Sequence, residues 1–505
     1  MPPGRKSSPS AGENCCQLCP PPYGHLTLLP KKGSELFFLL LNQWLQVCDE
    51  KHKHPNLARI LPTRVIRVSD PNKLELYDSH GECGMFIALS HIRGAISNAH
   101  KTVKKNVNER RKLIQFDELP RTFQDAVTVT RKLGVPYLWI DSICVIQDDI
   151  EDCKRESGRM ESVFRSAYCT IAATSANSCE DGFLQPDGHP AWHPYKCPAP
   201  IPYGCHTYLP CKQGYSLQGT SFCFSEAVQD FSLHVEQSEL NKRAWAFQER
   251  ALSCRTIHFT ATQTYWECGS GTASEGAGWI LENKNPLGSS EFPVCSSRPF
   301  WEHQPSAYEY VFSEYSKLGL APWKDRPSAI AGLESRLGMF YRTVSVYGIF
   351  ERFFHQSLLW HRARDRVIPI PEFESGSVPS WSWMAYEGEI AYKAFCLPDD
   401  VTKKNDFKFS LVAASQYALE APLFQISWND TTGQIMYDGE SSTDGQGTRG
   451  NIKGQKCIVI AQSRGNSYVL LVSPRDNLRQ GYRRVGVARV KSGYLSYIDS
   501  TVFVV

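Results

Sequence analysis

The chain has 505 residues, of which 42% are hydrophobic and 21% are charged, a composition typical of a globular protein with ample material for a core. Its formal net charge of +3 excludes the strong global field that would draw in nucleic acid or an anionic membrane surface. At roughly 150 residues per domain, the length suggests about three domains. We therefore expect no nucleic-acid partner.

The sequence lacks the patterns of a membrane span and of a secretory signal. Its most apolar run, residues 36–41, is far shorter than the roughly 18 residues that a span needs. The first residues are polar and contain no apolar signal core. We expect a cytoplasmic protein without a membrane span.

The first sixty residues divide into two parts. Residues 1–33 are rich in Pro, Gly and Ser and predict a flexible tail. Residues 34–60 predict a helix followed by a linker, with Ser34 capping the start of the helix.

The 18 cysteines are expected to be mostly reduced and buried, as in other intracellular proteins. One group offers an alternative, because Cys16, Cys19, Cys48 and His52 could together supply four zinc ligands. The first pair lies in the predicted tail, and the gap to the second pair is longer than in most compact zinc fingers. We favour ordinary thiols and assign no metal, and the zinc alternative stays open.

Residues 61–182 alternate apolar strands with helices. Helical spacing predicts one helix over 119–134, ending at Gly134, and a second helix over 150–167. Such alternation indicates a parallel sheet covered on both faces. The strands are expected within 61–70 and at 73–78, 84–90, 137–141 and 169–174.

The rest of the chain loses this rhythm. Residues 186–216 and 273–300 predict loops, and the last hundred residues predict antiparallel strands separated by turns. The Trp381 and Trp383 side chains are expected to pack in a core. Between these regions we expect a helix at 243–253, paired strands over 255–268, and helices near 306–318 and 326–338.

Polar residues follow three of the apolar strands at the point where each strand ends. Ser90 and Arg93 follow the first, Asp141 and Gln147 the second, and Thr174 the third. In parallel α/β sheets ligands bind at the carboxyl ends of the strands, so these side chains are expected on one rim. The alternative is that Asp141 closes a loop by accepting hydrogen bonds from backbone amides.

Glu156 is a further candidate, because it lies on or beside the apolar face of the second predicted helix. Partial desolvation there would raise the pKa of its carboxyl group unless a cation offsets the effect. Perturbed carboxylates of this kind are enriched at functional sites, but structural ion pairs also produce them. A plain salt-bridge partner could be Arg131, Arg155 or Arg159.

A thiol mechanism is the less favoured reading of the same rim. His91, Asp141 and Cys144 could form a nucleophilic set. Cys144 lies between apolar neighbours, however, so we expect its side chain to point into the core. The absence of GxSxG, GxxxxGK[ST] and HExxH argues against a serine hydrolase, a P-loop NTPase and a zinc protease.

Several stretches, in order, resemble the fungal heterokaryon incompatibility (HET) domain proteins. The central block "LPRTFQDAVTVTRKLGVPYLWIDSICVIQDD" at 119–149 is similar almost throughout. Three residues depart from the family pattern: Arg93 stands where the family has Trp, Cys153 where it has Trp, and Phe164 where it has Tyr. The other stretches are "LPTRVI" (61–66), "FIALSHIRG" (86–94), "ESGRMESVFRSAYCTIAATSA" (156–176), "RAWAFQERALSCRTIHF" (243–259), "PSWSWMAYEG" (379–388) and "YRRVGV" (482–487).

The resemblance implies an α/β fold in which a HET domain at 61–270, with a mainly parallel, TIR-like sheet flanked by helices, precedes an α+β region at 271–505 that ends in antiparallel strands. It implies an effector of non-self recognition and programmed cell death that acts through protein partners and could form a homo-oligomer. Two alternatives remain: an NAD(P) glycohydrolase, and an accessory protein of fungal secondary metabolism. In the enzyme, Glu156 would be catalytic, NAD would be a substrate rather than a cofactor, and the substrate would contact Ser90, Arg93, Asp141 and Gln147.

Overall fold

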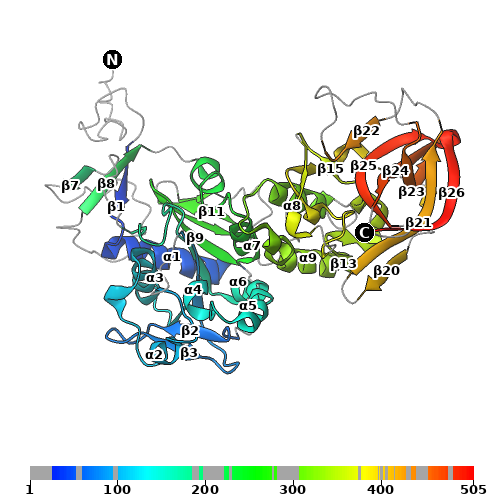
Figure 1. Ribbon diagram of the computed structural model, residues 1–505. Helices are drawn as coiled ribbons and strands as arrows, with labels where there is room; N and C mark the ends of the chain where they lie inside the picture. Colours follow the sequence, from blue (N-terminus) through cyan, green and yellow to red (C-terminus); the bar gives the residue numbers. More distant parts are fainter. Residues whose placement is uncertain are drawn as a thin grey trace, which may run out of the picture. The chain divides into compact units, whose positions relative to one another are not determined.

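The structure is a computed structural model of the chain. The residues that it describes are 26–52, 60–94, 100–184, 193–196, 221–226, 230–275, 278–280, 306–364, 366–373, 377–395, 397–398, 402–403, 408–413, 416–427, 434–439, 453–475 and 481–505. They divide into two compact units, which are described separately below (Figure 1). The first unit comprises residues 1–150, 166–240 and 254–284, and the second comprises 151–165, 241–253 and 285–505.

The first unit is built on a nine-stranded mixed sheet. The four central strands, β9, β6, β4 and β5, run parallel to their neighbours, as predicted, and the strands on both sides of them are antiparallel. The order across the sheet is β12 (Gly278–Ile280), β11 (Gly271–Ser274), β10 (Thr264–Cys268), β9 (Arg255–Phe259), β6 (Cys169–Ala172), β4 (Phe86–Ser90), β5 (Tyr137–Trp139), β2 (Arg64–Arg67) and β3 (Glu75–Asp78).

The central strands are buried on both faces. All five residues of β4 and all four of β6 are buried, which explains their unbroken apolar sequences. Helix α1 (Glu35–Lys51) covers the β9–β10 side, where the Phe37 and Phe259 rings lie 6.1 Å apart and the Trp44 and Trp266 rings 6.5 Å apart. The Oγ atom of Ser34 accepts a hydrogen bond from the backbone N–H of Phe37, which confirms the predicted cap.

Of the two helices predicted between these strands, one is confirmed and one is not. Helix α3 (Arg121–Lys132) ends just before Gly134, whose φ of +69° fits a glycine stop. The single helix predicted over 150–167 was wrong, because the chain forms α5 (Ile150–Ser157) and α6 (Met160–Ser166). Gly158 lies at the break, where its low helix propensity favours an interruption. Two short helices, α2 (Val107–Arg110) and α4 (Asp141–Cys144), complete this part of the chain.

Three further strands form a small antiparallel sheet in the order β1 (Leu26–Pro30), β8 (Ser221–Glu226) and β7 (His193–Lys196). Strand β1 lies at the end of the predicted tail and β7 within the predicted loop at 186–216. The rest of that loop lies outside the described residues. The loop predicted at 273–300 was wrong at its start, because β12 continues the main sheet there by pairing with β11.

The second unit contains α5, α6 and a group of helices with an eight-stranded sheet. Strands β23, β24, β25, β26 and β21 form a ring that closes where β21 pairs with β23 (Figure 1). The sheet strands are β19 (Thr402–Lys403), β20 (Lys408–Ala413), β21 (Gln416–Ile426), β22 (Gln434–Tyr437), β23 (Lys456–Ser463), β24 (Asn466–Pro474), β25 (Gly481–Lys491) and β26 (Leu495–Val504). The helices are α7 (Ala244–Leu252), α8 (Ser306–Ser316), α9 (Arg326–Tyr341) and α10 (Phe354–Ser357).

These strands confirm the predicted antiparallel C-terminal region, apart from one short parallel contact between β25 and β26. Apolar side chains of β21, β23 and β24 pack in two clusters. Trp381 and Trp383 are fully buried, as predicted. Short strand pairs border this core: β13 (Ser345–Val346) with β14 (Ile349–Phe350), β15 (His361–Arg362) with β18 (Ile390–Ala391), and β16 (Ile368–Pro369) with β17 (Tyr386–Glu387).

Among the helices that the structure describes, none combines the length and the apolar character needed to cross a bilayer.

Candidate functional site

Three parallel strands of the first unit end at the same edge of the sheet. Ala88 of β4 pairs with Trp139 of β5, and Ser90 of β4 pairs with Ala172 of β6. The segments after β4, β5 and β6 therefore start side by side, which confirms the common rim expected from the sequence. Ser90 itself is buried, with 5% of its surface exposed.

Asp141 is the central charged group of this rim. It opens the one-turn helix α4, directly after β5. One carboxylate oxygen accepts a hydrogen bond from the backbone N–H of Ser142 at 2.5 Å, and the other accepts hydrogen bonds from the Arg93 guanidinium, whose Nε lies at 2.7 Å. The rim thus contains an arginine–carboxylate ion pair joined across 48 positions of sequence.

The two partners of this ion pair differ in exposure. The Asp141 side chain is 13% exposed, whereas that of Arg93 is 47% exposed. Burial opposes ionisation of Asp141, but the charge of Arg93, the nearby His91 ring and the hydrogen bonds from Arg93 and Ser142 outweigh it. The pKa of Asp141 therefore lies below its usual value. The rim presents a fixed, ionised carboxylate beneath an arginine that solvent can reach.

Gln147 holds the segment after α4 in place. Its Nε2 donates hydrogen bonds to the backbone oxygens of Asp141 at 3.1 Å and Val145 at 3.0 Å. Its backbone N–H donates to the Thr102 carbonyl at 2.8 Å. These contacts supply positional support for Asp141, and a substrate contact by Gln147 stays a prediction.

Cys144 points into the core, as the sequence predicted. It is 1% exposed, and its backbone oxygen accepts a hydrogen bond from Nε of the buried Arg64 at 2.7 Å. His91 is also buried, with its ring packed edge-on against that of Phe123 at 5.1 Å. This burial does not favour a solvent-accessible thiolate nucleophile at Cys144.

Glu156 lies on α5 in the second unit and is 3% exposed. Its Oε1 lies 3.1 Å from Nε of Arg155 and 4.0 Å from Nη1 of Arg159, so two of the three predicted salt-bridge partners contact it. The third, Arg131, instead donates hydrogen bonds to the backbone oxygens of Val68 and Asp70. Asp152, one turn before Glu156 and also 3% exposed, pairs with Arg155 as well.

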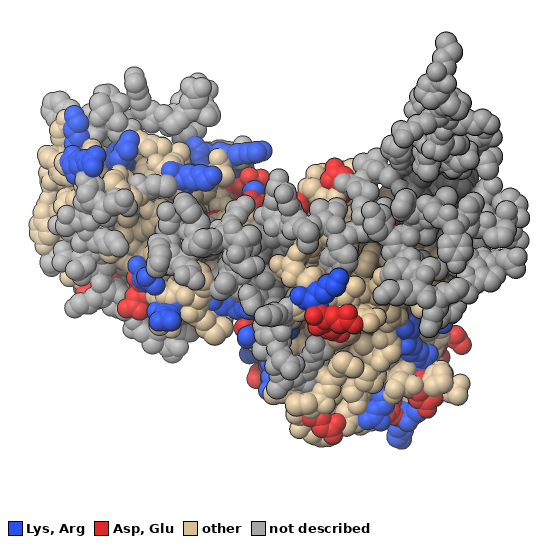
Figure 2. Space-filling model, turned by 180° about the vertical axis from the view of Figure 1, so that it is seen from behind, with Lys and Arg blue, Asp and Glu red and all other residues tan. Residues whose placement is uncertain are grey.

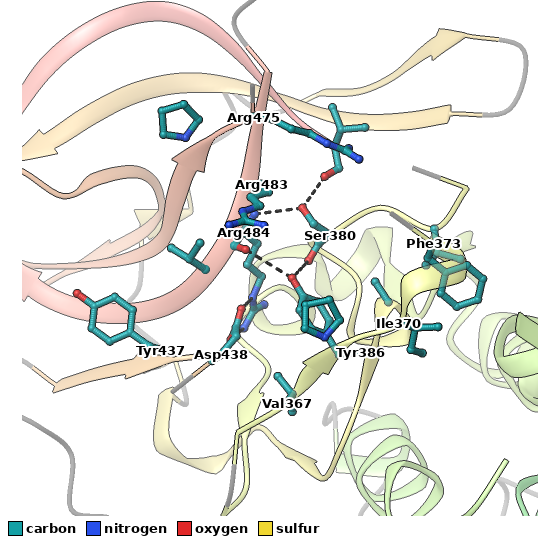
Figure 3. A pocket seen from close by; sticks show the side chains of 17 residues that line it. Val367, Ile370, Phe373, Ser380, Tyr386, Tyr437, Asp438, Arg475, Arg483 and Arg484 are labelled. Atoms are coloured by element: carbon teal, nitrogen blue, oxygen red, sulfur yellow. Dashed lines mark hydrogen bonds and ion pairs between the residues drawn. The ribbon is translucent and has the colours of Figure 1, made fainter. Parts of the chain in front are cut away.

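A cavity of about 700 Å³ lies in the second unit (Figure 3). Ser380 and Tyr386 line it from one stretch, and Arg483 and Arg484 line it from β25. These residues belong to "PSWSWMAYEG" and "YRRVGV", two stretches in which the sequence resembles the HET proteins. The Tyr386 hydroxyl donates a hydrogen bond to the Ser380 carbonyl at 3.0 Å (Figure 3). This bond links two residues of the first stretch that line the cavity.

The walls of this cavity combine apolar and cationic groups. Val367, Ile370 and Phe373 supply apolar surface, and the exposed Arg483 and half-buried Arg475 supply positive charge. A ligand with an apolar part and an anionic group would match this combination. The sequence indicated these stretches by their motifs, but it gave no sign that they line one cavity.

Charge on the face shown in Figure 2 is mixed. Basic and acidic side chains both occur there, and much of the described surface between them is neither.

Two of the four residues considered as zinc ligands, Cys16 and Cys19, lie outside the described residues. The other two, Cys48 and His52, lie within reach of each other and of Cys268, a residue that the sequence did not single out. Sequence spacing could not have identified Cys268, because 216 positions separate it from His52.

The comparisons with known proteins find a family whose model matches part of the chain. The sequence model of the heterokaryon incompatibility protein (HET) family matches residues 86–249. No curated protein and no solved structure matches the chain. The matched region includes β4, α3, β5, α4 and β6, which carry the rim, together with α5 and α6. Residues 86–249 of this protein therefore match a heterokaryon incompatibility (HET) domain, as the motifs in its sequence predicted.

Proposed function

We propose that this protein is an effector of fungal non-self recognition that triggers programmed cell death. The family match over residues 86–249 carries the proposal, because the family is named for heterokaryon incompatibility. The rim of the sheet supports it, since a polar site lies where α/β sheets bind their ligands.

We propose that the working surface of the effector is the rim around Asp141. Its carboxylate is held by the Ser142 amide and the Arg93 guanidinium, so its position is fixed before any partner arrives. Arg93 is half exposed and can donate hydrogen bonds outward to a carboxylate or phosphate of a partner. On binding, Arg93 would then exchange Asp141 for the anionic group of the partner.

The test is inducible expression of the full chain in a filamentous fungus, with hyphal growth and viability as readouts. We expect wild-type protein to arrest growth and Asp141→Asn to relieve the arrest, because the neutral amide cannot hold Arg93 in the same charged pair. Asp117→Asn is the matched control, since Asp117 is exposed and lies in the same unit. Immunoblots should show equal levels of all three proteins.

The possible outcomes test separately whether the protein is an effector and whether the rim is its working surface. Normal growth with abundant wild-type protein, in hosts with and without an incompatible partner strain, would contradict the effector role. Arrest that Asp141→Asn and Asp117→Asn leave equally strong would retain the effector role but remove the rim as its working surface.

A second candidate function, an NAD(P) glycohydrolase, rests on the buried carboxylates of α5. Asp152 and Glu156 are each 3% exposed and share Arg155. Burying two carboxylates one helical turn apart costs free energy, which the shared Arg155 offsets, and buried ionisable groups of this kind are enriched at functional sites. In this reading, Glu156 would hold the ribose hydroxyls of NAD as nicotinamide leaves.

Incubation of the purified chain with NAD, followed by measurement of released nicotinamide, tests this candidate. Glu156→Gln should abolish turnover, whereas Glu151→Gln should not, because the Glu151 side chain on the same helix is 81% exposed. Absence of turnover in the wild-type chain, or equal turnover in Glu156→Gln, would exclude Glu156 as a catalytic group.

A further inference from the structure

A second group of reactive side chains lies in the first unit, around the last turn of α1. Cys48 and His52 are one helical turn apart, and the backbone N–H of His52 bonds to the Cys48 carbonyl at 3.1 Å. Cys268, the last residue of β10, joins them from the sheet. The two Sγ atoms and a ring nitrogen of His52 all lie within 4.8 Å of one another.

The spacing of these atoms suits a tetrahedral metal ion. The Sγ of Cys268 and the Nδ1 of His52 are 3.4 Å apart. In a tetrahedral zinc site, bond lengths of about 2.3 Å to sulfur and about 2.0 Å to nitrogen place two such ligands about 3.5 Å apart. The distance therefore needs almost no adjustment. Both cysteines are thiols rather than halves of a disulfide, so their sulfur atoms are available as ligands.

The surroundings fix the three ligands in place. Cys48 and Cys268 are fully buried, whereas His52 is half-buried. Asp49, next to Cys48, accepts hydrogen bonds from Nη2 of Arg255 at 2.5 Å and from the Tyr168 hydroxyl at 2.7 Å. These contacts anchor the last turn of α1 to β9 and to the segment before β6.

We propose that Cys48, His52 and Cys268 form a zinc site that fastens helix α1 to the β10 end of the sheet. A set of two thiolates and one imidazole binds zinc in preference to magnesium, calcium or manganese, which favour oxygen ligands. The fourth position is filled by water or another donor. This site is separate from the rim at Asp141 and does not depend on the proposed function.

The first experiment measures the zinc content of the full chain, purified without chelators, by elemental mass spectrometry. We expect about one zinc per chain in the wild type and almost none in Cys48→Ser or Cys268→Ser. Cys457→Ser is the matched control, because Cys457 is an equally buried thiol in the second unit. The control should retain the wild-type zinc content.

The second experiment uses a variant that leaves the buried core intact. His52→Ala changes a half-buried residue at the end of α1, so folding should be preserved. We expect its zinc affinity, measured by competition with a chromogenic chelator, to fall by more than about 100-fold, beyond the range typical of an outer-shell substitution. Cobalt(II) titrated into the metal-free wild type should give visible absorption bands of tetrahedral intensity and a thiolate charge-transfer band, and both should weaken in Cys268→Ser.

Three results would overturn the proposal. One is a wild-type chain that binds no zinc, whether or not non-reducing peptide mapping finds a Cys48–Cys268 disulfide. Another is zinc content unchanged in Cys48→Ser, Cys268→Ser and His52→Ala. The third is loss of zinc only in the double variant Cys16→Ser/Cys19→Ser, which would place the metal in the N-terminal segment.

Discussion

Each of the two units contains an arginine–aspartate ion pair, and the two pairs differ in almost every physical respect. In the first unit, Arg93 is 47% exposed and Asp141 13% exposed. In the second, the side chains of Arg484 and Asp438 are 0% and 5% exposed. The chemical groups are the same, so the difference in environment decides what each pair can do.

The buried pair is held by several contacts within the protein. Arg484 donates to both carboxylate oxygens of Asp438, at 2.9 and 3.2 Å, and to the backbone oxygens of Leu358 and Trp360. Its guanidinium also lies 3.3 Å from the centre of the Trp360 ring. Arg484 borders the cavity of the second unit, and its burial and these contacts hold it in the cavity wall. An arginine held in this way stabilises the fold, whereas the exposed Arg93 can also bind a ligand.

The largest expected effect is loss of the buried pair. Arg484→Ala would leave the Asp438 carboxylate buried without its cation, so the free energy of unfolding of the second unit should fall by about 3–5 kcal/mol. Chemical denaturation followed by Trp fluorescence would measure it. Arg483→Ala, an exposed neighbour on the same strand, should change stability by less than about 0.5 kcal/mol. Equal effects of the two substitutions would contradict the structural role assigned to Arg484.

The next largest effect is the pH dependence of stability that one buried glutamate in each unit should cause. Burial raises the pKa of Glu275 in the first unit and of Glu309 in the second, each to about 7. Because these folded-state values exceed the unfolded ones, the stability contribution is full below about pH 4.3 and is lost as the pH rises through about 7. Glu275→Gln should flatten the pH dependence of hydrogen exchange around β10, and Glu309→Gln should do so around α8. If either substitution altered the pH dependence of hydrogen exchange in the other unit, the titration of that glutamate would not be a local effect.

The smallest effect on stability is expected at the exposed pair. Arg93→Ala should lower the free energy of unfolding by less than about 1 kcal/mol, because solvent screens the interaction. It should nevertheless raise the pKa of Asp141, whose lowered value depends on Arg93. A carboxyl group whose pKa is lower in the folded than in the unfolded state stabilises the fold at pH values above its unfolded pKa. This stabilisation is lost as the pH falls through the folded-state pKa, so the variant, with its higher folded-state pKa, should lose it at a higher pH. Carboxyl-carbon NMR titration would measure the shift, and an unchanged pKa would contradict the ion pair.

Local sequence patterns predicted much of the first unit. The cap at Ser34, the stop at Gly134 and the ends of β4, β5 and β6 all depend on neighbours within a few residues. Continuous apolar strands alternating with helices were enough to place Asp141 on a parallel-strand rim. The break at Gly158 was missed because the apolar face continues on both sides of it, so periodicity alone does not reveal it.

Contacts between distant segments could not be predicted. The approach of Arg93 to Asp141 depends on the order of strands in the sheet, and that of Cys268 to His52 depends on how α1 crosses it. The ring closed by β21 and β23 likewise follows from pairing between strands that no local pattern connects. The candidate site was thus predictable as a set of residues, but its interactions required the fold.

The match to the HET family ends at residue 249, in the middle of α7 (Ala244–Leu252). This helix packs against α9, where the Gln248 side chain accepts a hydrogen bond from the backbone N–H of Gly332 at 2.9 Å. A recombinant fragment cut at the family boundary would lose the last turn of α7 and the whole of its partner helix, and would leave Phe247, which is buried in the intact chain, facing water. Expression trials should therefore keep α9, because a shorter product would aggregate for reasons unrelated to its toxicity.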